Sequence, residues 1–383
     1  MRILFVTATY LPTINGISLS IKLQKDELIA RGHKITIIAP KHHGQRKESG
    51  VIRLPSLSNP KYPDYPIIVP IPYEDSHFKV LGKKFDVVYF HHPFYLGETA
   101  ILLAKYFKCP SVFFYHTQYD EYPKTILPKE IPYKPVKKYI INHIKELSSK
   151  VDHIVVETPT LKNKLRLFGV KSAISVVTSG RQSMKHMEIS KTKLRTMYSL
   201  PIDNTIILCV SRLSKEKNLG TLIKIIKDLK TKKKVTLVIA GDGPERSNFE
   251  ELVAKSNLTN IIFLGNIDYN KLSEIYSLAD IFAYPSKTDT QAIVLIEAMS
   301  AGLPLVCFDS PGPKDFIINN KNGILCANIG DFKKSLNKLI IDSKLREEMG
   351  RTSTLYAKDY SFSVSMDKIE QTLKKVVSEY RSK

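Results

Sequence analysis

Two acidic residues eight positions apart are the first candidates for chemistry: Asp289 and Glu297, in the stretch YPSKTDTQAIVLIEAMSAGLPLV. On one continuous helix this spacing of about two turns would place both carboxylates on the same face. The apolar run that ends at Pro285 instead favours a strand, a loop with Asp289, and a helix that starts near Gln291 and carries Glu297. A ligand would bind beside both carboxylates, at the carboxyl edge of the sheet. The alternative for Glu297 is a structural pair with a cation or a helix cap.

A glycine after the first apolar run is a second candidate for ligand binding. Asn15 and Gly16 in TATYLPTINGIS open a helical segment that runs to about Arg31. A glycine at the carboxyl end of a strand lets a phosphate approach the amides at the start of the next helix. The segment is not GxGxxG, which argues against a dinucleotide site. A plain strand-to-helix turn explains Gly16 equally well.

Short apolar, β-branched runs alternate with helix-length segments along the whole chain. RILFVTA, FDVVYF and HIVVET are examples in the first half, and TIILCVSRL, KVTLVIAG and PLVCFDS in the second. Strands of this kind belong to parallel sheets that helices cover on both faces. We therefore predict an α/β fold with two Rossmann-like domains, residues 1–180 and residues 181–362, and a helix at about 363–383 that can pack back on the first domain.

The composition is that of a globular protein with an unusual charge. Of 383 residues, 43% are hydrophobic, and the formal net charge is +21, of which +13 falls in residues 1–190. Genome-wide lysine usage explains such an excess, and so do an anionic membrane, nucleic acid or phosphate-bearing ligands. The charge is dispersed, without a helix-turn-helix, an RNP-like motif or a zinc finger. We therefore expect no nucleic-acid partner.

The spacing of the cysteines and the length of the apolar runs indicate where in the cell the protein is found. The four cysteines lie far apart without CxxC spacing, which argues against disulfides and a zinc site and favours a reducing compartment. No apolar run approaches the ~18 residues of a membrane span. The first residues have no signal-peptide cleavage site. We expect a cytoplasmic protein.

Several motifs, in their order along the chain, resemble one large enzyme family. They are NGI at 15–17, DVVYFHHPFYLG at 86–97, FYHTQYDEY at 114–122, VSRLSKEKN at 210–218, IAGDGPE at 239–245, and the acidic signature itself. This order is similar to that of retaining, nucleotide-sugar-dependent glycosyltransferases of the GT-B fold, of the family four type with a Glu-x7-Glu signature. The HTQYDEY and TDTQ pieces look most like the subgroup that transfers glucose or mannose to lipids, notably diacylglycerol α-glucosyltransferases.

The resemblance implies that the second domain binds the donor nucleotide. Arg212 and Lys217 would stabilise the charge of the diphosphate leaving group, with a solvated loop as the alternative. Gly241 and Gly243 would form the turn along which the base packs, although a tight turn alone also explains them. Gly16 would hold the far phosphate from the first domain.

Three catalytic residues are also implied by the resemblance. Asp289 would bind hydroxyls of the donor sugar, Glu297 the ribose hydroxyls, and His116 the sugar C6 hydroxyl near the scissile bond. A lone histidine is often structural, which is the alternative for His116. The donor site would also include Thr290 and Gln291. The acceptor mouth would be lined by Tyr119, Asp120, Glu121 and Tyr122.

The implied reaction moves a hexose, glucose from UDP-glucose, to a membrane lipid such as diacylglycerol, with retention and without a metal. The sequence has no DxD motif and no His/Asp cluster with metal-ligand spacing. A phosphatidylinositol, a soluble sugar or a glycan is the alternative acceptor. The expected partners are a nucleotide sugar, a lipid acceptor and an anionic membrane surface, on the inner face of the cell membrane.

Three positions depart from the family pattern. Asp289 is one methylene shorter than the family glutamate, which could shift sugar preference or turnover. Arg181 follows ISVVTSG where the family often has G-I/V-D. Ala292 replaces a frequent glycine, which makes the local backbone less permissive.

A basic, amphipathic segment follows HTQYDEY at residues 124–150. It has seven lysines against two acids, and a start that is rich in proline. Such a helix can lie in an anionic membrane interface. The alternative is a helix that packs on its own sheet with solvated lysines. The residues expected to contact the membrane are Lys134, Lys137, Lys138, Ile140, Ile144 and Lys145.

Overall fold

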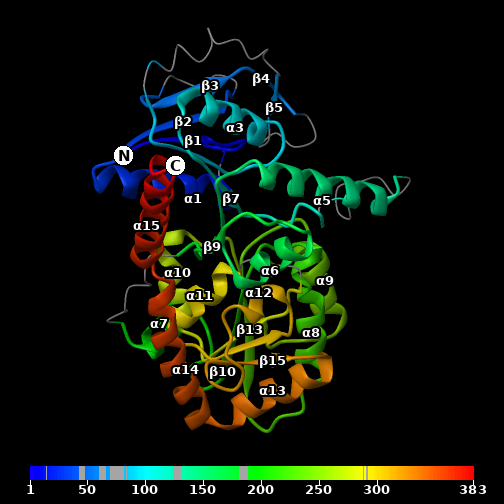
Figure 1. The fold of residues 1–383 in the computed structure, drawn as a ribbon. Coiled ribbons are helices and arrows are strands. Elements are labelled where there is room, and N and C mark those ends of the chain that lie inside the picture. Colours follow the sequence, from blue (N-terminus) through cyan, green and yellow to red (C-terminus); the bar gives the residue numbers. More distant parts are fainter. Residues whose placement is uncertain are drawn as a thin grey trace. The chain divides into compact units, whose positions relative to one another are not determined.

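The computed structural model describes residues 1–13, 15–42, 48–59, 66–69, 82, 84–121, 123, 131–180, 189–287, 289 and 292–383. These residues form two compact units (Figure 1). Unit 1 consists of Met1–Ser179 and Ser365–Lys383, and unit 2 of Gly180–Val364.

Unit 1 is built on a parallel sheet of seven strands in the order β3-β2-β1-β6-β7-β8-β9. The strands are β1 (Arg2–Val6), β2 (Lys34–Pro40), β3 (Val51–Leu54), β6 (Val87–Phe90), β7 (Ser111–Tyr115), β8 (His153–Val156) and β9 (Ile174–Val176). A separate antiparallel pair joins β4 (Ser56–Leu57) and β5 (Ile67–Ile68). Strands β6, β7 and β8 are buried along their whole length, which is why their sequences are apolar except at Ser111 and His153, the first residues of β7 and β8.

Helices cover both faces of this sheet, because successive side chains of a strand point to opposite faces. Leu4 and Phe113 belong to a core cluster with residues of three helices. Phe5 and Phe114, their neighbours in the chain, point to the other face. There the Tyr89 hydroxyl donates a hydrogen bond to Gln24 at 3.4 Å. The helices are α1 (Gly16–Ala30) on the Gln24 face, and α3 (Leu96–Phe107), α5 (Tyr133–Ser149) and α6 (Pro159–Leu167) in the core cluster.

The last helix of the chain, α15 (Phe362–Arg381), supplies a segment of unit 1. Its buried side chains are Ser365, Met366, Ile369, Leu373, Val376 and Val377. Arg31 donates to Asp367 at 2.6 Å and to Glu370 at 3.0 Å, and His33 lies 3.0 Å from the same Glu370 carboxylate. Lys374 first, and then Arg31 and His33, lower the pKa of Glu370 to about 2.

Unit 2 has a parallel sheet of six strands in the order β12-β11-β10-β13-β14-β15. The strands are β10 (Thr205–Val210), β11 (Val235–Ala240), β12 (Ile261–Gly265), β13 (Ile281–Tyr284), β14 (Leu305–Phe308) and β15 (Gly323–Cys326). The helices are α7 (Lys191–Met197), α8 (Leu219–Lys227), α9 (Arg246–Lys255), α10 (Leu272–Ser277), α11 (Ile293–Ser300), α12 (Pro311–Lys314), α13 (Ile329–Ile341) and α14 (Ser343–Ala357). Two core clusters, one on each face of the sheet, hold these helices against it.

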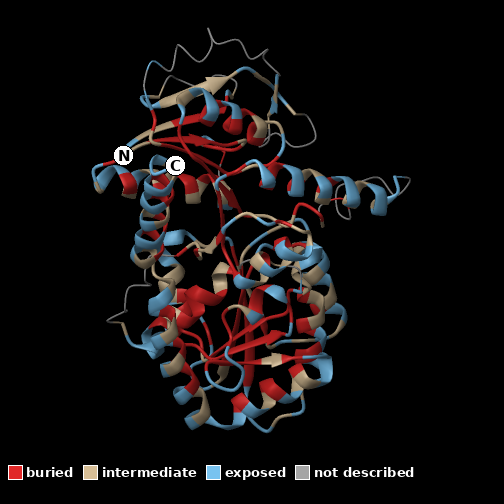
Figure 2. Ribbon diagram, in the orientation of Figure 1, coloured by how far each residue is buried: buried red, intermediate tan, exposed pale blue. Residues whose placement is uncertain are grey.

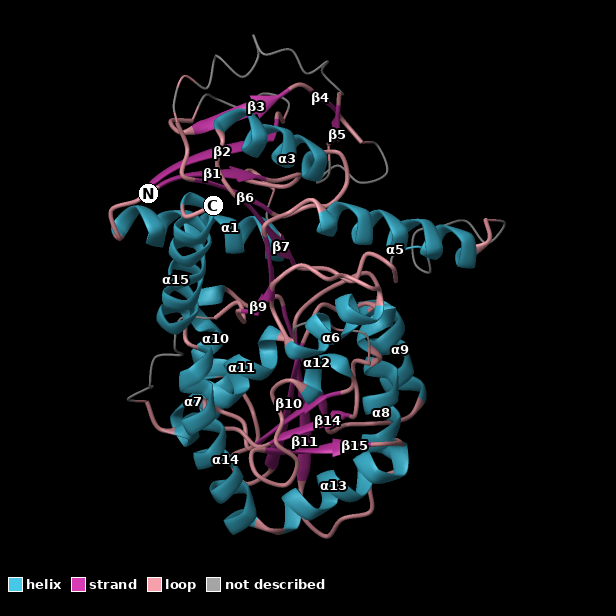
Figure 3. Cartoon of the chain, viewed as in Figure 1, coloured by secondary structure: helices cyan, strands magenta, loops and turns pink. Residues whose placement is uncertain are grey.

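The prediction of two parallel α/β sheets is confirmed. In each unit the central strands of the sheet are buried, and strands alternate with helices along the chain (Figures 2 and 3). All four cysteines are free and buried. No helix in the described part of the chain is long and apolar enough to span a membrane.

The two chain connections between the units run against each other. A β-carbon on Gly180 would overlap the carbonyl oxygen of Ser361, so only glycine fits at this position. The Ser365 hydroxyl donates to the carbonyl oxygen of Thr178. The first of these contacts lies within unit 2 and the second within unit 1.

Candidate active site

Asp289 lies in the loop after β13, as predicted, and both of its carboxylate oxygens have partners. Lys217 donates to one oxygen at 2.6 Å, and the Tyr284 hydroxyl donates to the other. Lys217 also lies 3.4 Å from the Tyr284 hydroxyl. A β-carbon on Gly312 would lie 2.7 Å from the Asp289 carbonyl oxygen, so α12 packs closely on this loop. The structure therefore joins Lys217 and Asp289, to which the sequence assigned separate roles.

Glu297 lies on α11, which begins at Ile293 rather than near Gln291. Its side chain is buried, and the Tyr276 hydroxyl of α10 donates to it at 2.7 Å. Burial and the Glu297 carboxylate raise the pKa of Tyr276 well above its usual value. We call Lys217, Tyr276, Tyr284, Asp289 and Glu297 the acid cluster. Thr290 and Gln291 lie outside the described residues.

Gly241 and Gly243 form a turn after β11 that the packing of unit 2 itself requires. Gly241 has φ +131°, and a β-carbon there would overlap the carbonyl oxygen of Ser211. A β-carbon on Gly243 would overlap the carbonyl oxygen of Leu213 in the same way. The turn therefore packs directly against the loop that carries Arg212, and the tight-turn explanation accounts for both glycines without a ligand.

Arg212 is exposed and forms no ion pair within the part of the chain that the structure describes. Lys217 differs, because it closes a short 3-10 turn (Lys215–Lys217) and is paired with Asp289. The two predicted phosphate-binding cations thus have different surroundings. An anionic ligand can contact the exposed Arg212 guanidinium directly, whereas the Lys217 ammonium is already paired with the Asp289 carboxylate.

His116 lies at the end of β7 in unit 1 and is 7% exposed. Its Nδ1 atom is 3.1 Å from Glu157, and its Nε2 atom is 2.8 Å from Nδ1 of His91. The Ser179 hydroxyl donates to the same oxygen of Glu157 at 2.7 Å. We call His91, His116, Glu157 and Ser179 the histidine cluster. Sequence reasoning missed His91 and Glu157, although each directly follows a buried strand, as catalytic side chains of parallel sheets do.

Burial and the neighbouring His116 lower the pKa of His91 well below its usual value, so this imidazole is neutral. Its Nε2 atom is buried without a hydrogen-bond partner among the described residues. Burial likewise lowers the pKa of His92 to about 3. The His92 Nδ1 atom accepts a hydrogen bond from the backbone N–H of Ala8 at 3.1 Å. His116 is thus held between the His91 imidazole and the Glu157 side chain.

Gly16 is the first residue of α1, and Asn15 and Ser18 cap this helix through reciprocal hydrogen bonds. A β-carbon on Gly16 would meet no atom within 4 Å. Internal packing thus does not require glycine at this position, in contrast to Gly241 and Gly243. The space left open leads to the backbone amides at the start of the helix.

Of the residues predicted to line the acceptor mouth, Tyr119 and Asp120 are buried and Glu121 is partly exposed. Asp120 is fully buried and pairs with Lys164 at 2.7 Å and with Lys137 at 3.1 Å. Glu121 pairs with Lys137 at 2.6 Å. Tyr119 is 6% exposed. These contacts anchor the loop after β7 to α5 and α6, and only Glu121 of this group is partly exposed; Tyr122 lies outside the described residues.

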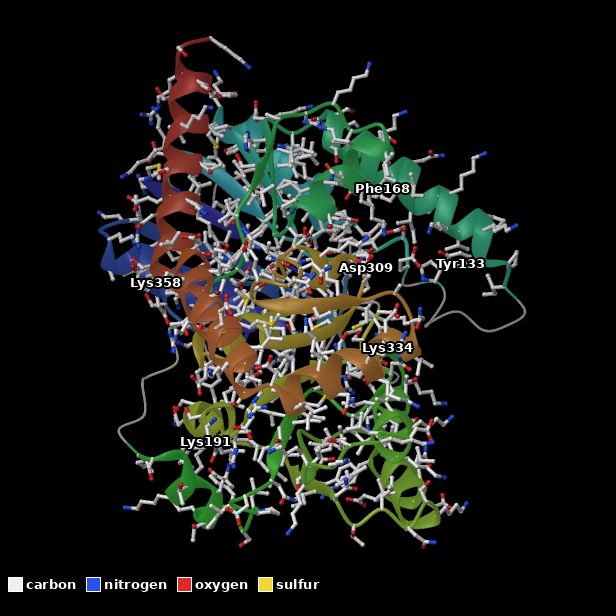
Figure 4. All side chains as sticks on the ribbon, turned by 90° about the horizontal axis from the view of Figure 1, so that it is seen from below. Tyr133, Phe168, Lys191, Asp309, Lys334 and Lys358 are labelled. Carbon is white, nitrogen blue, oxygen red and sulfur yellow. The ribbon has the colours of Figure 1, made fainter. Side chains whose placement is uncertain are left out.

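Two aromatic residues lie beside these lysines: Tyr133 at the start of α5 and Phe168 at the end of α6, both labelled in Figure 4. Lys137 lies 5.6 Å from the centre of the Tyr133 ring, and Lys164 lies 5.8 Å from that of Phe168. The Tyr133 hydroxyl donates to the carbonyl oxygen of Asp120 at 3.2 Å. The two lysines are therefore held by a ring as well as by carboxylates.

Two of the six residues of α5 that were predicted to contact the membrane are buried in unit 1 instead. Ile140 and Ile144 are buried in the core of unit 1, because the apolar stripe of this helix packs on its own sheet. Lys137 is paired with Asp120 and Glu121. The remaining predicted lysines, Lys134, Lys138 and Lys145, are exposed, and Tyr139 beside them is 66% exposed. Residues 124–130 lie outside the described residues.

Comparisons with known proteins assign the chain to a family. The model for Glycosyl transferases group 1 matches residues 190–355, and that for Glycosyltransferase Family 4 matches residues 14–181. The chain is a glycosyltransferase of the family four type. Among its curated relatives is an alpha-monoglucosyldiacylglycerol synthase of Acholeplasma laidlawii, 24% identical over 381 residues, which cover 95% of this chain and 94% of the relative.

A GDP-mannose-dependent alpha-mannosyltransferase of Corynebacterium glutamicum is 25% identical over 358 residues, 91% of this glycosyltransferase and 83% of the relative. The fold is GT-B. Sucrose-phosphate synthase from Thermosynechococcus elongatus matches with a TM-score of 0.77 at 17% identity, over 99% of this chain and 100% of that one. Anabaena HepE in complex with UDP matches with the same TM-score, 0.77, at 16% identity, over 98% and 100%.

Proposed function

We propose that this glycosyltransferase moves glucose from UDP-glucose to a membrane lipid acceptor such as diacylglycerol, with retention of configuration. The observation that carries the proposal is the similarity over nearly the whole chain to two alpha-monoglucosyldiacylglycerol synthases, at 24% and 26% identity. The acid cluster, with two carboxylates and a cation at the carboxyl edge of the unit 2 sheet, supplies groups that bind sugar hydroxyls and phosphate.

A second donor, GDP-mannose, is supported by three relatives that are named GDP-mannose-dependent alpha-mannosyltransferases. A screen that pairs UDP-glucose and GDP-mannose with diacylglycerol, phosphatidylinositol and soluble sugars decides between them. Nucleotide release and the mass of the product are read for each pair. Product from UDP-glucose and diacylglycerol supports the first proposal. Product from GDP-mannose alone, or with a soluble acceptor alone, overturns it.

In the donor complex, we assign Asp289 to hydroxyls of the sugar and Glu297 to those of the ribose. A buried carboxylate that is oriented on two hydroxyls selects its ligand, because a donor without them leaves the carboxylate unpaired. Glu297 is the more buried of the two, with 5% of its surface exposed. Gly241 and Gly243 keep the neighbouring turn flat enough for a base to lie along it.

The diphosphate leaving group gains negative charge as its bond to the sugar breaks. Arg212 and Lys217 are proposed to stabilise that charge. Gly16 would admit the far phosphate to the amides at the start of α1, where its missing β-carbon leaves space. These fixed cations and amides would replace a divalent metal. The rate should therefore stay within about twofold of its value when EDTA is added, and recovery of a lost rate by Mg²⁺ or Mn²⁺ would refute the proposal.

His116 is assigned to the C6 hydroxyl of the donor sugar. The Nδ1 atom of His116 faces Glu157, so the Nε2 atom, which lies 2.8 Å from His91, is the atom that we assign to the sugar hydroxyl. In the transfer step the acceptor oxygen bonds to the sugar C1 atom while the bond from C1 to the phosphate oxygen breaks. The proton of the acceptor hydroxyl passes to that phosphate oxygen on the same face of the sugar, which retains the configuration.

The lipid acceptor requires contact with a membrane, and we propose that exposed residues of α5 provide it. Lys134, Lys138 and Lys145 are exposed cations, and Tyr139 is an exposed aromatic residue among them. Each cation near an anionic surface contributes about 1 kcal/mol. The protein would then act at the inner face of the cell membrane.

Vesicle co-sedimentation tests this contact with the full chain. Lys134→Glu/Lys138→Glu should bind vesicles that contain anionic lipid at least 10-fold more weakly than the wild type, and wild-type binding should fall as salt is raised. The matched control is Lys224→Glu/Lys227→Glu on α8 of unit 2. Equal binding of both double variants, or equal wild-type binding to neutral and anionic vesicles, would contradict the proposal.

A further inference from the structure

The two signature acids each accept a hydrogen bond from a buried tyrosine. Tyr284 donates to Asp289, and Tyr276 donates to Glu297 at 2.7 Å. The tyrosines are eight positions apart in the sequence, as the acids are. We propose that Tyr276 and Tyr284 are positioning residues for donor binding, and that Tyr284 is the residue that makes an aspartate effective at position 289. This inference rests on the proposed function.

The tyrosine rings are fixed by their own packing. Tyr276 is fully buried in α10, and Tyr284, the last residue of β13, is 2% exposed. The Phe282 ring lies between them, with its centre 5.8 Å from that of Tyr276 and 6.2 Å from that of Tyr284. A buried phenol must place its hydroxyl on a partner. Since the rings cannot move freely, their hydroxyls determine where the carboxylates lie.

Both phenols act as donors throughout the pH range of an ordinary assay. Burial raises the pKa of each hydroxyl well above 10, and the carboxylate that accepts its hydrogen bond raises it further. A protonated phenol donates its hydrogen bond to the acid and leaves the remaining lone pairs of that carboxylate to other donors, such as sugar hydroxyls. Each pair thus orients a carboxylate without neutralising its charge.

The Tyr284 hydroxyl fits an aspartate better than a glutamate at position 289, because the two acidic side chains differ in length. Asp289 is one methylene, about 1.5 Å, shorter than a glutamate. Its two oxygens are held by two different groups, Tyr284 on one side and Lys217 on the other. A glutamate at this position would extend its carboxylate past the Tyr284 hydroxyl. The contribution of that hydroxyl should therefore depend on which acid is present.

A double-mutant cycle on the full chain measures this dependence. It compares wild type, Tyr284→Phe, Asp289→Glu and the combined variant by kcat/KM for the nucleotide sugar. We expect Tyr284→Phe to lower kcat/KM about 10-fold when Asp289 is present and less than about twofold when glutamate is present. Removing one hydroxyl leaves the ring and its packing in place, so all four proteins should fold, and circular dichroism and thermal melting verify this.

The matched control is Tyr198→Phe. The Tyr198 hydroxyl donates to Glu274 at 2.6 Å, which is the same type of pair in the same unit but involves neither signature acid. This variant should keep kcat/KM within about twofold of the wild type. Tyr276→Phe should lower it about 10-fold, through Glu297. An equal effect of Tyr284→Phe in both backgrounds, or an effect of Tyr198→Phe as large as that of Tyr284→Phe, would overturn the positioning role.

Failure of the proposed function has a different signature. If the wild type transfers no sugar from either donor to any acceptor, the proposed function is wrong. The four proteins of the double-mutant cycle are then compared by their Kd values for UDP-glucose and for GDP-mannose, which calorimetry measures. Binding of one of these donors that weakens with Tyr284→Phe only beside Asp289 supports the positioning role. Binding of neither donor, or binding that is insensitive to the cycle, overturns it.

Discussion

The histidine cluster of unit 1 and the acid cluster of unit 2 hold their polar side chains in different ways. His116 lies between the imidazole of His91 and the carboxylate of Glu157. The acids of unit 2 are held by phenols whose pKa values are raised well above 10, so their donors keep their protons. The comparison indicates that unit 2 holds its acids through phenol donors and one lysine, whereas unit 1 orients its histidine between a second imidazole and a carboxylate.

The comparison is tested most strongly by Glu297→Gln. We expect kcat/KM to fall at least about 100-fold, or about 2.7 kcal/mol, because the neutral amide lacks the charge that accepts the hydrogen bond of Tyr276 and that is proposed to accept those of the ribose hydroxyls. Initial rates at subsaturating donor measure this fall. The control, Glu274→Gln, changes a tyrosine-bound acid of unit 2 that is outside the acid cluster, and it should have little effect. A rate within threefold of the wild type would exclude Glu297 from the donor site.

Arg212→Ala should have the next largest effect. It removes the exposed cation from the loop after β10, and the Kd of UDP, measured by calorimetry, should rise about 30-fold, or about 2 kcal/mol. Lys215→Ala in the same loop is the control, since Lys215 is 85% exposed and pairs only distantly with Glu245, at 3.9 Å. Equal changes in the two variants would show that the loop attracts phosphate by net charge alone.

Glu157→Gln tests the histidine cluster of unit 1, and we expect it to have a smaller effect than the two substitutions in unit 2. The amide replaces the carboxylate that lies 3.1 Å from the Nδ1 atom of His116, so His116 is oriented less well, and kcat should fall about 10-fold, or about 1.4 kcal/mol, with little change in KM. Glu98→Gln, whose carboxylate pairs with His143 at 3.2 Å, is the control. A fall in activity larger than that caused by Glu297→Gln would show that the histidine cluster contributes more to the reaction than the acid cluster does.

The smallest effect is expected for Glu370→Gln, which affects the stability of unit 1 and leaves both clusters intact. The pKa of Glu370 is lowered from 4.5 to about 2, so its ionised form stabilises the folded state above about pH 4.5, and this stabilisation is lost as the pH falls through 2. At pH 7 the variant should be less stable by about 1 kcal/mol, the usual contribution of one such hydrogen bond. Near pH 2 the two proteins should unfold alike.

Urea unfolding at both pH values measures this difference. The control is Glu379→Gln on the same helix, whose carboxylate is 60% exposed and lies 3.8 Å from Lys375. Equal destabilisation by the two variants at pH 7 would show that the helix responds to its charge as a whole and that the contacts of Glu370 to Arg31 and His33 have no particular weight.

The fold was predictable because its strands are buried on both faces. Runs such as those of β7 and β11 are buried at every position and almost wholly apolar, and a parallel sheet that helices cover on both faces buries such runs completely. The positions of Asp289 in a loop and Glu297 on a helix followed from the same pattern. The helix was predicted to start near Gln291, whereas α11 begins at Ile293, after Ala292, which makes no side-chain cap hydrogen bond.

The partners of these residues were not predictable from the sequence. Tyr276 and Glu297 are 21 positions apart on different helices, and His116 and Glu157 are 41 apart, each directly after a different strand. A hydrogen bond between elements depends on how those elements pack, which periodicity does not reveal. The burial of Asp120 and Ile144 was not predictable either, because it depends on the lysines that pair with Asp120 and on the core that receives Ile144.

Helix α15 has a consequence for how the protein is made. Unit 1 is interrupted in the sequence by the 185 residues of unit 2, so its last segment leaves the ribosome after all of them. At ordinary rates of synthesis the delay is about 10–40 s. During that interval the surface that receives Leu373 and Val376 stays uncovered, and Arg31 has no partner on α15. A nascent or truncated chain without residues 365–383 therefore presents an apolar surface to chaperones and proteases, although the sheet of unit 1 is complete.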